Sequence, residues 1–344
     1  MNSKNWKRIK NSQLDKNLFI KRAKIIRAIR EFFWNTGFLE VETPEVVALP
    51  GQEPYLDVFE TELHDDRGKK IPAALVTSPE YAMKKILAAG YQKIFQLTKA
   101  FRNNESLGGI HNPEFTILEW YRQSADYLDI MKDTEALIKF IIKKLGLPTM
   151  IAYQGTEIDL SGRWHRLTVT QAMKNYAGVS NLSDGGIRRA AKKKGYRVEN
   201  DEPYDSIFFR LFLNEVEDKL PKNLPIFIYD YPAELAALAK RKNDNPELAE
   251  RFELYIGGLE IANAFSELLD AKEQERRFLK EQELRKQSGR KIYPIDEELL
   301  AALSEIKNPC GGIALGIDRL VMLLTNQKDI NNVLFFPAKE LFHH

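Results

Sequence analysis

The chain has 344 residues, of which 44% are apolar and 29% are charged, a composition typical of a globular protein with a large core. The 51 lysine and arginine residues nearly balance the 49 acidic residues, so the net charge of +2 gives no overall indication of nucleic-acid binding. The single cysteine, Cys310, excludes an internal disulfide bond and a cysteine-rich metal site. Because the N-terminus is polar and no apolar run is long enough for a membrane span, the sequence predicts a soluble, cytoplasmic protein.

The N-terminal region is strongly basic. Ten lysine and arginine residues lie within the first 30 positions, against one acid, Asp15. This charge fits a solvated helix face, and it also fits a docking arm for an acidic partner. We treat residues 1–17 as a basic extension, because apolar residues begin to recur at helical spacing at Leu18. Gly37 is placed to end that helix.

Predicted strands and helices then follow along the chain. Residues 38–44 alternate between apolar and polar side chains and stop at a proline, which predicts a strand. Residues 127–146 have the spacing of an amphipathic helix, and we interpret residues from about 150 to 230 as a mostly helical insertion. The remaining predicted elements are strands within residues 71–122 and 251–270, an exposed helix over 271–289, a helix over 296–306 and a glycine-rich strand-to-helix junction over 311–324.

The first group of residues with unusual chemistry lies on two predicted strands joined by a polar loop, which would form an antiparallel pair. Alternation with period two places four side chains of the returning strand on one face: Phe115, Ile117, Glu119 and Tyr121. An aromatic ring, a carboxylate and a phenol together are typical of a pocket wall rather than of a core. Arg102, at the end of the outgoing strand, could bind a phosphate with its planar guanidinium group, although a surface ion pair with Glu105 is the simpler alternative.

A second group surrounds the dipeptide Gly257-Gly258, which is a signal for a two-residue hairpin turn. The register set by such a turn pairs Ile256 with Leu259, Tyr255 with Glu260 and Glu253 with Ala262. Glu253 and Glu260 would then lie diagonally on one face, where a Mg²⁺ ion bound with nucleotide phosphates would relieve their repulsion. Two exposed surface acids are the simpler alternative.

In the strand after this turn, the candidate pocket residues do not all fall on the same face. Asn263, Phe265 and Glu267 alternate out of phase with Glu260. Both sets of side chains can face one pocket only if the strand contains a bulge, which we predict near residues 261–263.

A third group, residues 311–324, joins a glycine-rich strand to a helix. Small residues there would let a ligand approach the backbone closely. Arg319 lies in the first turn of the helix, where a cation opposes the helix dipole, so a role in ligand binding explains it better than a structural one. The Gly-x-x-x-Gly spacing is only a weak indication of a dinucleotide loop, because no βαβ pattern accompanies it.

These three groups resemble the motifs of the class II aminoacyl-tRNA synthetase catalytic core. The strand over residues 38–44 resembles motif 1, residues 102–121 resemble motif 2 and residues 311–324 resemble motif 3, in that chain order. The resemblance covers residues 18–340. It implies an α+β catalytic domain built on a six-stranded antiparallel sheet flanked by helices, and a homodimer with motif 1 at the interface.

Within this class the lysyl group is the most similar. The matching segments are residues 77–81, 111–116, 257–263 and 265–268. Because only about 20 residues precede the first catalytic helix, we expect no N-terminal OB-fold anticodon domain. That layout resembles the elongation factor P–(R)-β-lysine ligases, which are paralogues of the lysyl-tRNA synthetases. The segments 78–81 and 119–122, and Ala314 where the synthetases usually have glycine, also resemble the ligase.

Some positions depart from both relatives. Asn104 stands where the family usually has a glutamate, so Glu105 is expected to take that role, in a motif 2 loop one residue longer than usual. Ala264 replaces a usual glycine, and residues 153–164 resemble the tRNA synthetases more than the compact ligases.

The resemblance implies a role for each matching residue. The expected amino-acid-binding residues are Ser78, Glu80, Glu119, Tyr121, Asn263, Phe265, Glu267 and Ala314. The expected ATP-binding residues are Arg102, Asn104, Glu105, His111, Asn112, Phe115, Glu260, Ile261, Gly316 and Arg319. Catalysis is expected from Arg102, Arg319 and Glu260, and Mg²⁺ binding from Glu253 and Glu260.

The residues themselves support a substrate with two ammonium groups. Glu80, Glu119 and Glu267 would give one pocket three carboxylates with little compensating positive charge, which is costly unless a cation fills it. The expected reaction is ATP-dependent activation of (R)-β-lysine or lysine, with transfer to elongation factor P. The alternatives are a lysyl-tRNA synthetase that acylates tRNA without an anticodon domain, and a non-catalytic paralogue.

Overall fold

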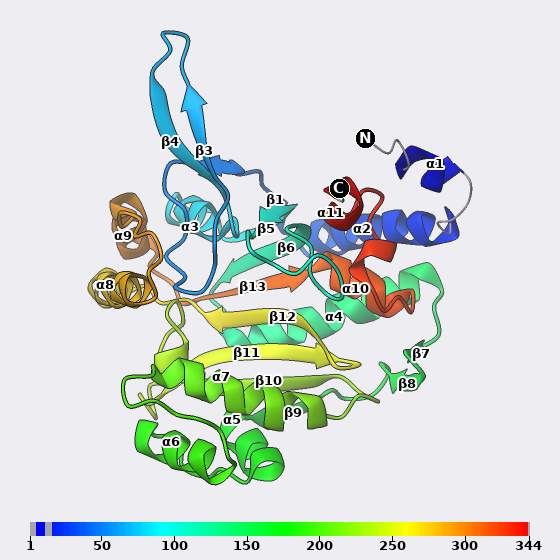
Figure 1. Ribbon diagram of the computed structural model, residues 1–344. Helices are drawn as coiled ribbons and strands as arrows, with labels where there is room; N and C mark the ends of the chain where they lie inside the picture. The colour runs from blue at the N-terminus through cyan, green and yellow to red at the C-terminus, as the bar shows by residue number, and fades with distance from the viewer. Residues whose placement is uncertain (1–4, 11–15, 343–344) are drawn as a thin grey trace.

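A sheet of eight strands forms the centre of the computed structural model, which describes residues 5–10 and 16–342 (Figure 1). Most of the basic extension, residues 1–4 and 11–15, lies outside the described residues. The strands in spatial order are β1 (Leu39–Glu40), β5 (Lys93–Phe101), β6 (Glu114–Gln123), β13 (Cys310–Gly316), β12 (Leu259–Ser266), β11 (Leu248–Ile256), β10 (Ile226–Pro232) and β9 (His165–Thr168).

The six central strands, from β5 to β10, all pair antiparallel, as expected. The expected number of six strands is wrong, because a short strand extends the sheet at each edge. At one edge β1 pairs parallel with β5, and at the other β9 pairs parallel with β10. The strand predicted over residues 38–44 is present only as β1, which has two residues, and β9 has four residues, too few for alternation to reveal its place in the sheet.

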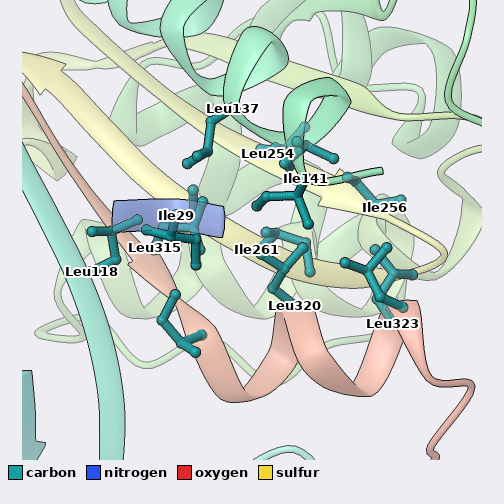
Figure 2. Close-up of a cluster of buried hydrophobic side chains, with 14 of the residues drawn as sticks. Ile29, Leu118, Leu137, Ile141, Leu254, Ile256, Ile261, Leu315, Leu320 and Leu323 are labelled. Atoms are coloured by element: carbon teal, nitrogen blue, oxygen red, sulfur yellow. The ribbon is translucent and has the colours of Figure 1, made fainter. Parts of the chain in front are cut away.

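Three helices enclose the main hydrophobic core with the sheet: α2 (Lys16–Asn35), α4 (Tyr127–Leu145) and α10 (Ile317–Leu324). Figure 2 shows side chains of these helices, such as Ile29, Leu137 and Leu320, meeting Leu118 and Leu315 of the sheet. Gly37 follows α2 with a φ of +79°, a conformation that glycine adopts without strain, which fits its predicted place at the end of that helix.

A second group of helices lies at the end of the sheet where the cavity described below is found. α3 (Glu80–Ala88), α8 (Ala271–Gln287) and α9 (Glu297–Glu305) share a smaller apolar cluster with β5, β6 and β13. The expectation that the helix over 271–289 is exposed is only partly right. One face of α8 is buried, including Arg277 and Arg285, because both guanidinium groups donate to backbone carbonyls.

The segment between α4 and β10 is more varied than a helical insertion. It begins with the hairpin of β7 (Met150–Tyr153) and β8 (Thr156–Asp159), followed by β9 of the main sheet. Helices occupy only its later part: α5 (Val169–Ala172), a π-helical turn (Met173–Ala177), α6 (Asp184–Lys193), α7 (Tyr204–Glu215) and a 3₁₀ turn (Glu217–Lys219). These helices form a second core against β10 and β11.

A smaller sheet of β2 (Val46–Val47), β4 (Lys70–Leu75) and β3 (Glu60–His64) carries a hairpin that projects from the rest of the fold (Figure 1). The remaining described helices are α1 (Asn5–Lys10), a 3₁₀ turn (Ala233–Leu235), a 3₁₀ turn (Ile330–Asn332) and α11 (Ala338–Leu341). Among residues 5–10 and 16–342, no helix combines the length and the apolar character that crossing a bilayer requires.

The predicted bulge in the glycine hairpin is confirmed. Tyr255 pairs with Glu260, but the next pair joins Leu254 to Ala262, so Ile261 is an extra residue in β12. The predicted pairing of Glu253 with Ala262 is wrong for the same reason: the bulge shifts the register, and Glu253 lies opposite Asn263.

Gly257 offers a test of how tightly this hairpin is packed, because Gly146 has the same φ of +63° in open surroundings. A Cβ at residue 257 would lie 2.9 Å from Ile158 Cδ1 and 3.0 Å from Tyr153 Cδ1, whereas nothing lies within 4 Å at residue 146. We expect Gly146→Ala to cost about 1 kcal/mol of unfolding free energy. Gly257→Ala should cost about 1–3 kcal/mol more, measured by urea denaturation. Equal losses would show that the two neighbouring side chains move aside freely.

Candidate active site

A cavity of about 330 Å³ lies on the sheet face opposite the main core. The four side chains predicted to share one face of β6 all line it: Phe115, Ile117, Glu119 and Tyr121. The intervening Leu118 belongs to the core. All but three of the residues that the sequence assigned to substrate, nucleotide or metal line this cavity, and the three that do not are Asn104, Glu253 and Glu267.

Glu119 is the central carboxylate at one end of the cavity. It is almost fully buried and accepts hydrogen bonds from Ser78 Oγ at 2.6 Å and from the Tyr121 hydroxyl at 2.9 Å. Burial, and then the charge of Glu80, raise the pKa of Glu119 to about 8, although the two hydrogen bonds oppose this. A cation bound beside Glu119 would favour its ionised form and so offset the effect of burial.

Lys84 is a cation in this region that the sequence analysis missed. Its side chain is 1% exposed, and its Nζ lies 2.6 Å from Glu80 Oε1 and 2.6 Å from Glu267 Oε2. Burial alone would lower the pKa of Lys84, but the two carboxylates raise it above its ordinary value. Glu267 was expected to face the ligand directly. Instead its side chain is fully buried, is paired with Lys84 and is not among those that line the cavity.

Gly312 leaves room for this arrangement. It pairs with Tyr121 on one side and with Phe265 on the other. A Cβ at this position would lie 2.1 Å from Glu267 Oε1 and 2.4 Å from Tyr121 Cε1. Since both side chains are buried, glycine is required for Glu267 and Tyr121 to occupy their places.

The other end of the cavity is lined by two arginines and an aromatic ring, Arg102, Arg319 and Phe115. The Arg102 guanidinium lies 5.1 Å from the centroid of the Phe115 ring, and the buried Arg102 Nε has no hydrogen-bond partner. A Cβ at Gly316 would lie 3.7 Å from Arg319 Cδ, so the glycine leaves space beside the aliphatic part of Arg319. An unpaired guanidinium N–H suits a phosphate oxygen, and a ring beside an open arginine stem suits a planar base.

Arg319 is held by groups on two other elements. Its NH1 donates to the Glu260 carbonyl at 2.9 Å and to Glu260 Oε2 at 3.2 Å, and its NH2 lies 3.0 Å from His111 Nε2. Burial, followed by the charge of Arg319, lowers the pKa of His111 below its ordinary value, with Arg102 acting in the same sense. A neutral His111 can accept the hydrogen bond from Arg319 and so fix its guanidinium plane.

Glu253 does not face the cavity, contrary to the prediction of a Glu253–Glu260 metal pair. Its Oε1 accepts from Arg251 at 2.7 Å, and its Oε2 accepts from the hydroxyls of Tyr231 at 2.6 Å and Tyr255 at 2.7 Å. The residues that the structure describes contain no group of three or more metal-ligating side chains. Glu260, which lines the cavity, therefore fits a Mg²⁺ ion shared with phosphate oxygens better than the pair does.

The motif 2 loop supports the expected substitution of Glu105 for Asn104. Asn104 has a φ of +59°, and its Nδ2 donates to Asp57 Oδ2 at 3.2 Å, away from the cavity that Glu105 lines. Asn112 lines the cavity and has a structural part as well. Its Nδ2 donates to the Glu114 carbonyl at 2.6 Å, and its Oδ1 accepts from the Ala338 amide at 3.0 Å.

Asp318 joins the cavity to the helix at the N-terminal side of the fold. Its Oδ2 accepts from the Thr116 amide at 2.7 Å, and its Oδ1 pairs with Arg22 NH1 of α2 at 2.6 Å. Arg22 NH2 also donates to Thr116 Oγ1 at 3.1 Å. Since Asp318 precedes Arg319, these buried bonds fix the first turn of α10 and hence the direction of the Arg319 side chain.

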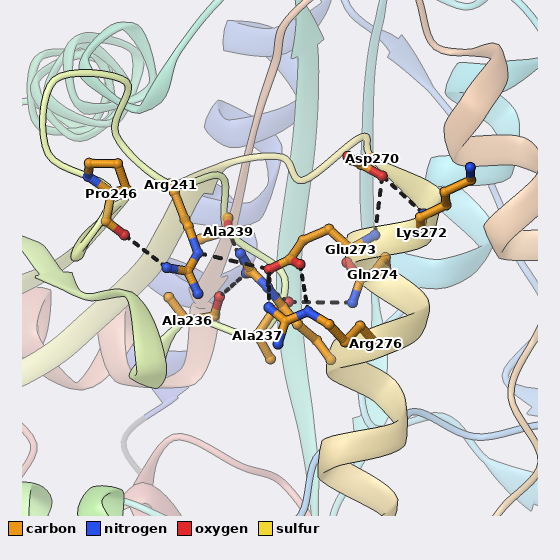
Figure 3. Close-up of polar contacts among 11 residues, drawn as sticks. Ala236, Ala237, Ala239, Arg241, Pro246, Asp270, Lys272, Glu273, Gln274 and Arg276 are labelled. Carbon is orange, nitrogen blue, oxygen red and sulfur yellow. Dashed lines mark hydrogen bonds and ion pairs between the residues drawn. The ribbon is translucent and has the colours of Figure 1, made fainter.

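The start of α8 supports the wall near Glu267. Figure 3 shows Asp270 receiving the amides of Lys272 and Glu273 at the start of the helix, and Glu273 paired with Arg276. Arg277 donates to the backbone carbonyls of the segment 236–239, from which Leu238 reaches the cavity. The wall is thus anchored by buried hydrogen bonds and not only by apolar contact.

Sequence reasoning missed other residues of the site. Glu53, Leu238 and Asp318 line the cavity, and Lys84 lies beside it. Lys84 follows Glu80 by four residues on a helix, a spacing that places two side chains on one face and could have suggested the pair. Glu53 and Leu238 lie outside regular secondary structure, where no periodicity marks them.

Comparison with known proteins identifies the fold. Residues 2–340 match the profile of the family described as tRNA synthetases class II (D, K and N). The chain belongs to this family. It is 42% identical over 337 residues to a lysine–tRNA ligase of Pelotomaculum thermopropionicum, which covers 94% of this chain and 63% of that protein. The lysine–tRNA ligases of Carboxydothermus hydrogenoformans and Thermoanaerobacter sp. (strain X514) are 40% and 38% identical, covering 93% and 94% of this chain and 64% of each relative.

As a class II synthetase of the D, K and N group, the chain spans slightly less than two thirds of the length of these relatives. The matched portion contains every residue that lines the cavity, from Glu53 to Ile330. None of these relatives is an elongation factor P ligase by name, so the comparisons favour the tRNA-acylating alternative over the main expectation.

The packing around Gly312 gives a testable consequence. Gly312→Ala should lower the unfolding free energy by about 1–3 kcal/mol or more, because the added methyl group meets two buried side chains. Gly316→Ala on the same strand is the control, since its nearest contact is an ordinary 3.7 Å and its φ is −74°. We expect that variant to stay within about 0.5 kcal/mol of the wild type in thermal unfolding. Equal stability of the two variants would contradict the close packing at Gly312.

Proposed function

We propose that this chain activates lysine with ATP as an acyl-adenylate and transfers the lysyl group to tRNA. The observation that carries the proposal is the cavity itself, which places buried carboxylates at one end and unpaired or ligand-ready arginines at the other. The first end suits an amino acid with ammonium groups, and the second suits phosphates. The names of the relatives support lysine and tRNA as substrates.

In the proposed first step, a carboxylate oxygen of the amino acid attacks the α-phosphorus of ATP. The bond between that phosphorus and the bridging oxygen breaks, and pyrophosphate leaves with the electron pair. No protein nucleophile is required, so catalysis depends on positioning and on stabilising phosphoryl charge. Arg102 would bind the α-phosphate and Arg319 the γ-phosphate, while Phe115 and the stem of Arg319 would enclose the base.

At the other end of the cavity, Glu119, Ser78 and Tyr121 would receive one ammonium group, and Asn263 would lie near the reacting carboxylate. Mg²⁺ would be held by Glu260 together with phosphate oxygens, where it supplies charge neutralisation. In the second step the acceptor oxygen or amine attacks the adenylate carbonyl, and AMP leaves.

Elongation factor P is the second candidate acceptor, with (R)-β-lysine as the amino acid. Ala314 favours it, because its side chain lines the cavity between Glu119 and Asn263, its partners on the two neighbouring strands. The resemblance at Ala314 and in residues 78–81 supports elongation factor P as the acceptor, whereas the names of the relatives support tRNA.

The deciding experiment is ATP–pyrophosphate exchange with α-lysine and with (R)-β-lysine, followed by transfer from the adenylate to tRNA and to elongation factor P. We expect exchange with α-lysine and labelled tRNA. Exchange only with β-lysine and labelled elongation factor P would replace the first candidate by the second. No exchange with either amino acid would reject both.

Ala314 gives a prediction about substrate choice. Moving the amine from the α to the β carbon displaces the ammonium group by about one bond length, and one methyl group in a close-packed pocket discriminates about 10- to 200-fold. Ala314→Gly should therefore shift the ratio of kcat/KM values toward α-lysine by a factor in that range. An unchanged ratio in exchange assays would remove the reason to connect Ala314 with the position of the amine.

The raised pKa of Glu119 predicts a pH dependence. In the empty cavity Glu119 holds a proton below about pH 8, and an ammonium ligand requires the ionised carboxylate. The KM for lysine in pyrophosphate exchange should therefore fall between pH 6 and pH 8, by roughly tenfold per pH unit for one displaced proton, while the KM for ATP changes little. Glu119→Gln should raise the KM and abolish this trend. A KM for wild-type protein that is flat over this range would contradict the assignment.

A further inference from the structure

Among the residues that the structure describes, Lys84 is the cation that pairs with the carboxylates at the amino-acid end of the cavity. The proposed reaction does not use it. It comes from α3, four residues after Glu80, and its Nζ also lies 5.5 Å from the centroid of the Phe265 ring. Its two carboxylate partners come from different parts of the chain, Glu80 at the start of α3 and Glu267 just after β12. One ammonium group thus joins the helix to the end of a strand.

The two carboxylates differ in their exposure to the cavity and in the hydrogen bonds that their oxygens still lack. Glu80 lines the cavity, and Lys84 is bonded to its Oε1. Glu267 Oε1 is buried beside Gly312 and has no hydrogen-bond partner. An unpaired carboxylate oxygen in a buried place is costly, and this one lies at Gly312 beside the ring of Tyr121, which lines the cavity.

A purely structural ion pair is the alternative, but a buried pair is weak evidence for stability. Removing two charges from water costs about as much as their attraction returns. An apolar residue at position 84 beside Phe265 and Met83 would serve packing equally well. The cost of burying Lys84 is better explained if the two carboxylates are needed for another purpose.

We infer that Lys84 is a positioning residue of the amino-acid pocket: its ammonium group, 2.6 Å from each carboxylate, ties Glu80 of α3 to Glu267 after β12 and so fixes where the two side chains lie beside the cavity. The inference rests on the proposed function. In this inference Lys84 sets the distance between the two carboxylates, and that distance determines where a primary ammonium ligand can bind.

The test compares Lys84→Ala and Lys84→Gln with Lys85→Ala in lysine-dependent pyrophosphate exchange. Lys85 is the matched control, because it is the next residue of α3 and pairs with Asp296 and Glu298, away from the cavity. Lys84→Ala should raise the KM for lysine roughly 10- to 100-fold, the effect of leaving buried partners unpaired, with the KM for ATP within about twofold of wild type. Lys84→Gln, which keeps donors without charge, should lie between. Lys85→Ala should leave both KM values unchanged.

Two further readouts separate positioning from folding. Propylammonium added to Lys84→Ala should lower the KM for lysine again, because it can fill the space between the two carboxylates. The charge of Lys84 also lowers the pKa of Glu119, so its removal should move the fall in KM to higher pH. If Lys84→Ala unfolds, Lys84→Gln supplies the same comparison.

The outcomes are distinct. Parallel losses in both KM values that follow the melting temperature, or an unchanged KM for lysine in folded Lys84→Ala, would overturn the positioning role. Propylammonium that restores the melting temperature but not the KM would overturn it too. A wild-type protein that shows no lysine-dependent exchange would reject the proposed function itself, before any variant is compared.

Discussion

The extra residue Ile261 in β12 determines what this cavity can contain. A regular strand turns every second side chain to the same face, so Glu260 would face away from Asn263 and Phe265. The bulge reverses the phase once, and Glu260 then lines one cavity together with Asn263 and Phe265. Arg319 bonds to both the carbonyl and the carboxylate of Glu260, so the placement of that arginine also follows from the bulge. A single change of register therefore links the two ends of the site.

Buried charge is the second constraint. Glu80, Glu119 and Glu267 meet at one end. Glu119 accepts from two hydroxyl donors, whereas Glu80 and Glu267 share Lys84, and burial raises the pKa of both Glu119 and Glu267 to about 8. At the opposite end, Arg102 keeps an unpaired Nε, while His111 and Glu260 hold Arg319. The site is thus asymmetric in charge along its length, and a ligand that is cationic at one end and anionic at the other fits both halves.

Local patterns in the sequence predict most of the sheet, because β5, β6, β12 and β13 are each at least seven residues long and the Gly257-Gly258 turn sets the register of its own hairpin up to the bulge. The edge strand β9 is too short for such a pattern, and β1 is only the first part of the strand predicted over residues 38–44. Within the site, the sequence correctly predicted that Arg102, Glu119 and Arg319 line the cavity, but it wrongly predicted the same of Glu253. Both carboxylate oxygens of Glu253 are already occupied by hydrogen bonds from Arg251, Tyr231 and Tyr255, and Tyr231 belongs to a separate strand. Contacts between distant segments leave no local periodicity.

Tyr255 also lies 3.4 Å from Glu217, which belongs to the 3₁₀ turn after α7, and the pKa of Glu217 is raised to about 7 by burial and by the nearby Glu253 and Glu260. The helices before this turn share their apolar cluster with β10 and β11 of the catalytic sheet. Excising residues 169–219 would therefore expose the apolar side of two central strands and alter the electrostatic environment of the phosphate end. Although this region is an insertion in the linear order of the chain, it covers two strands of the main sheet and is an integral part of the fold.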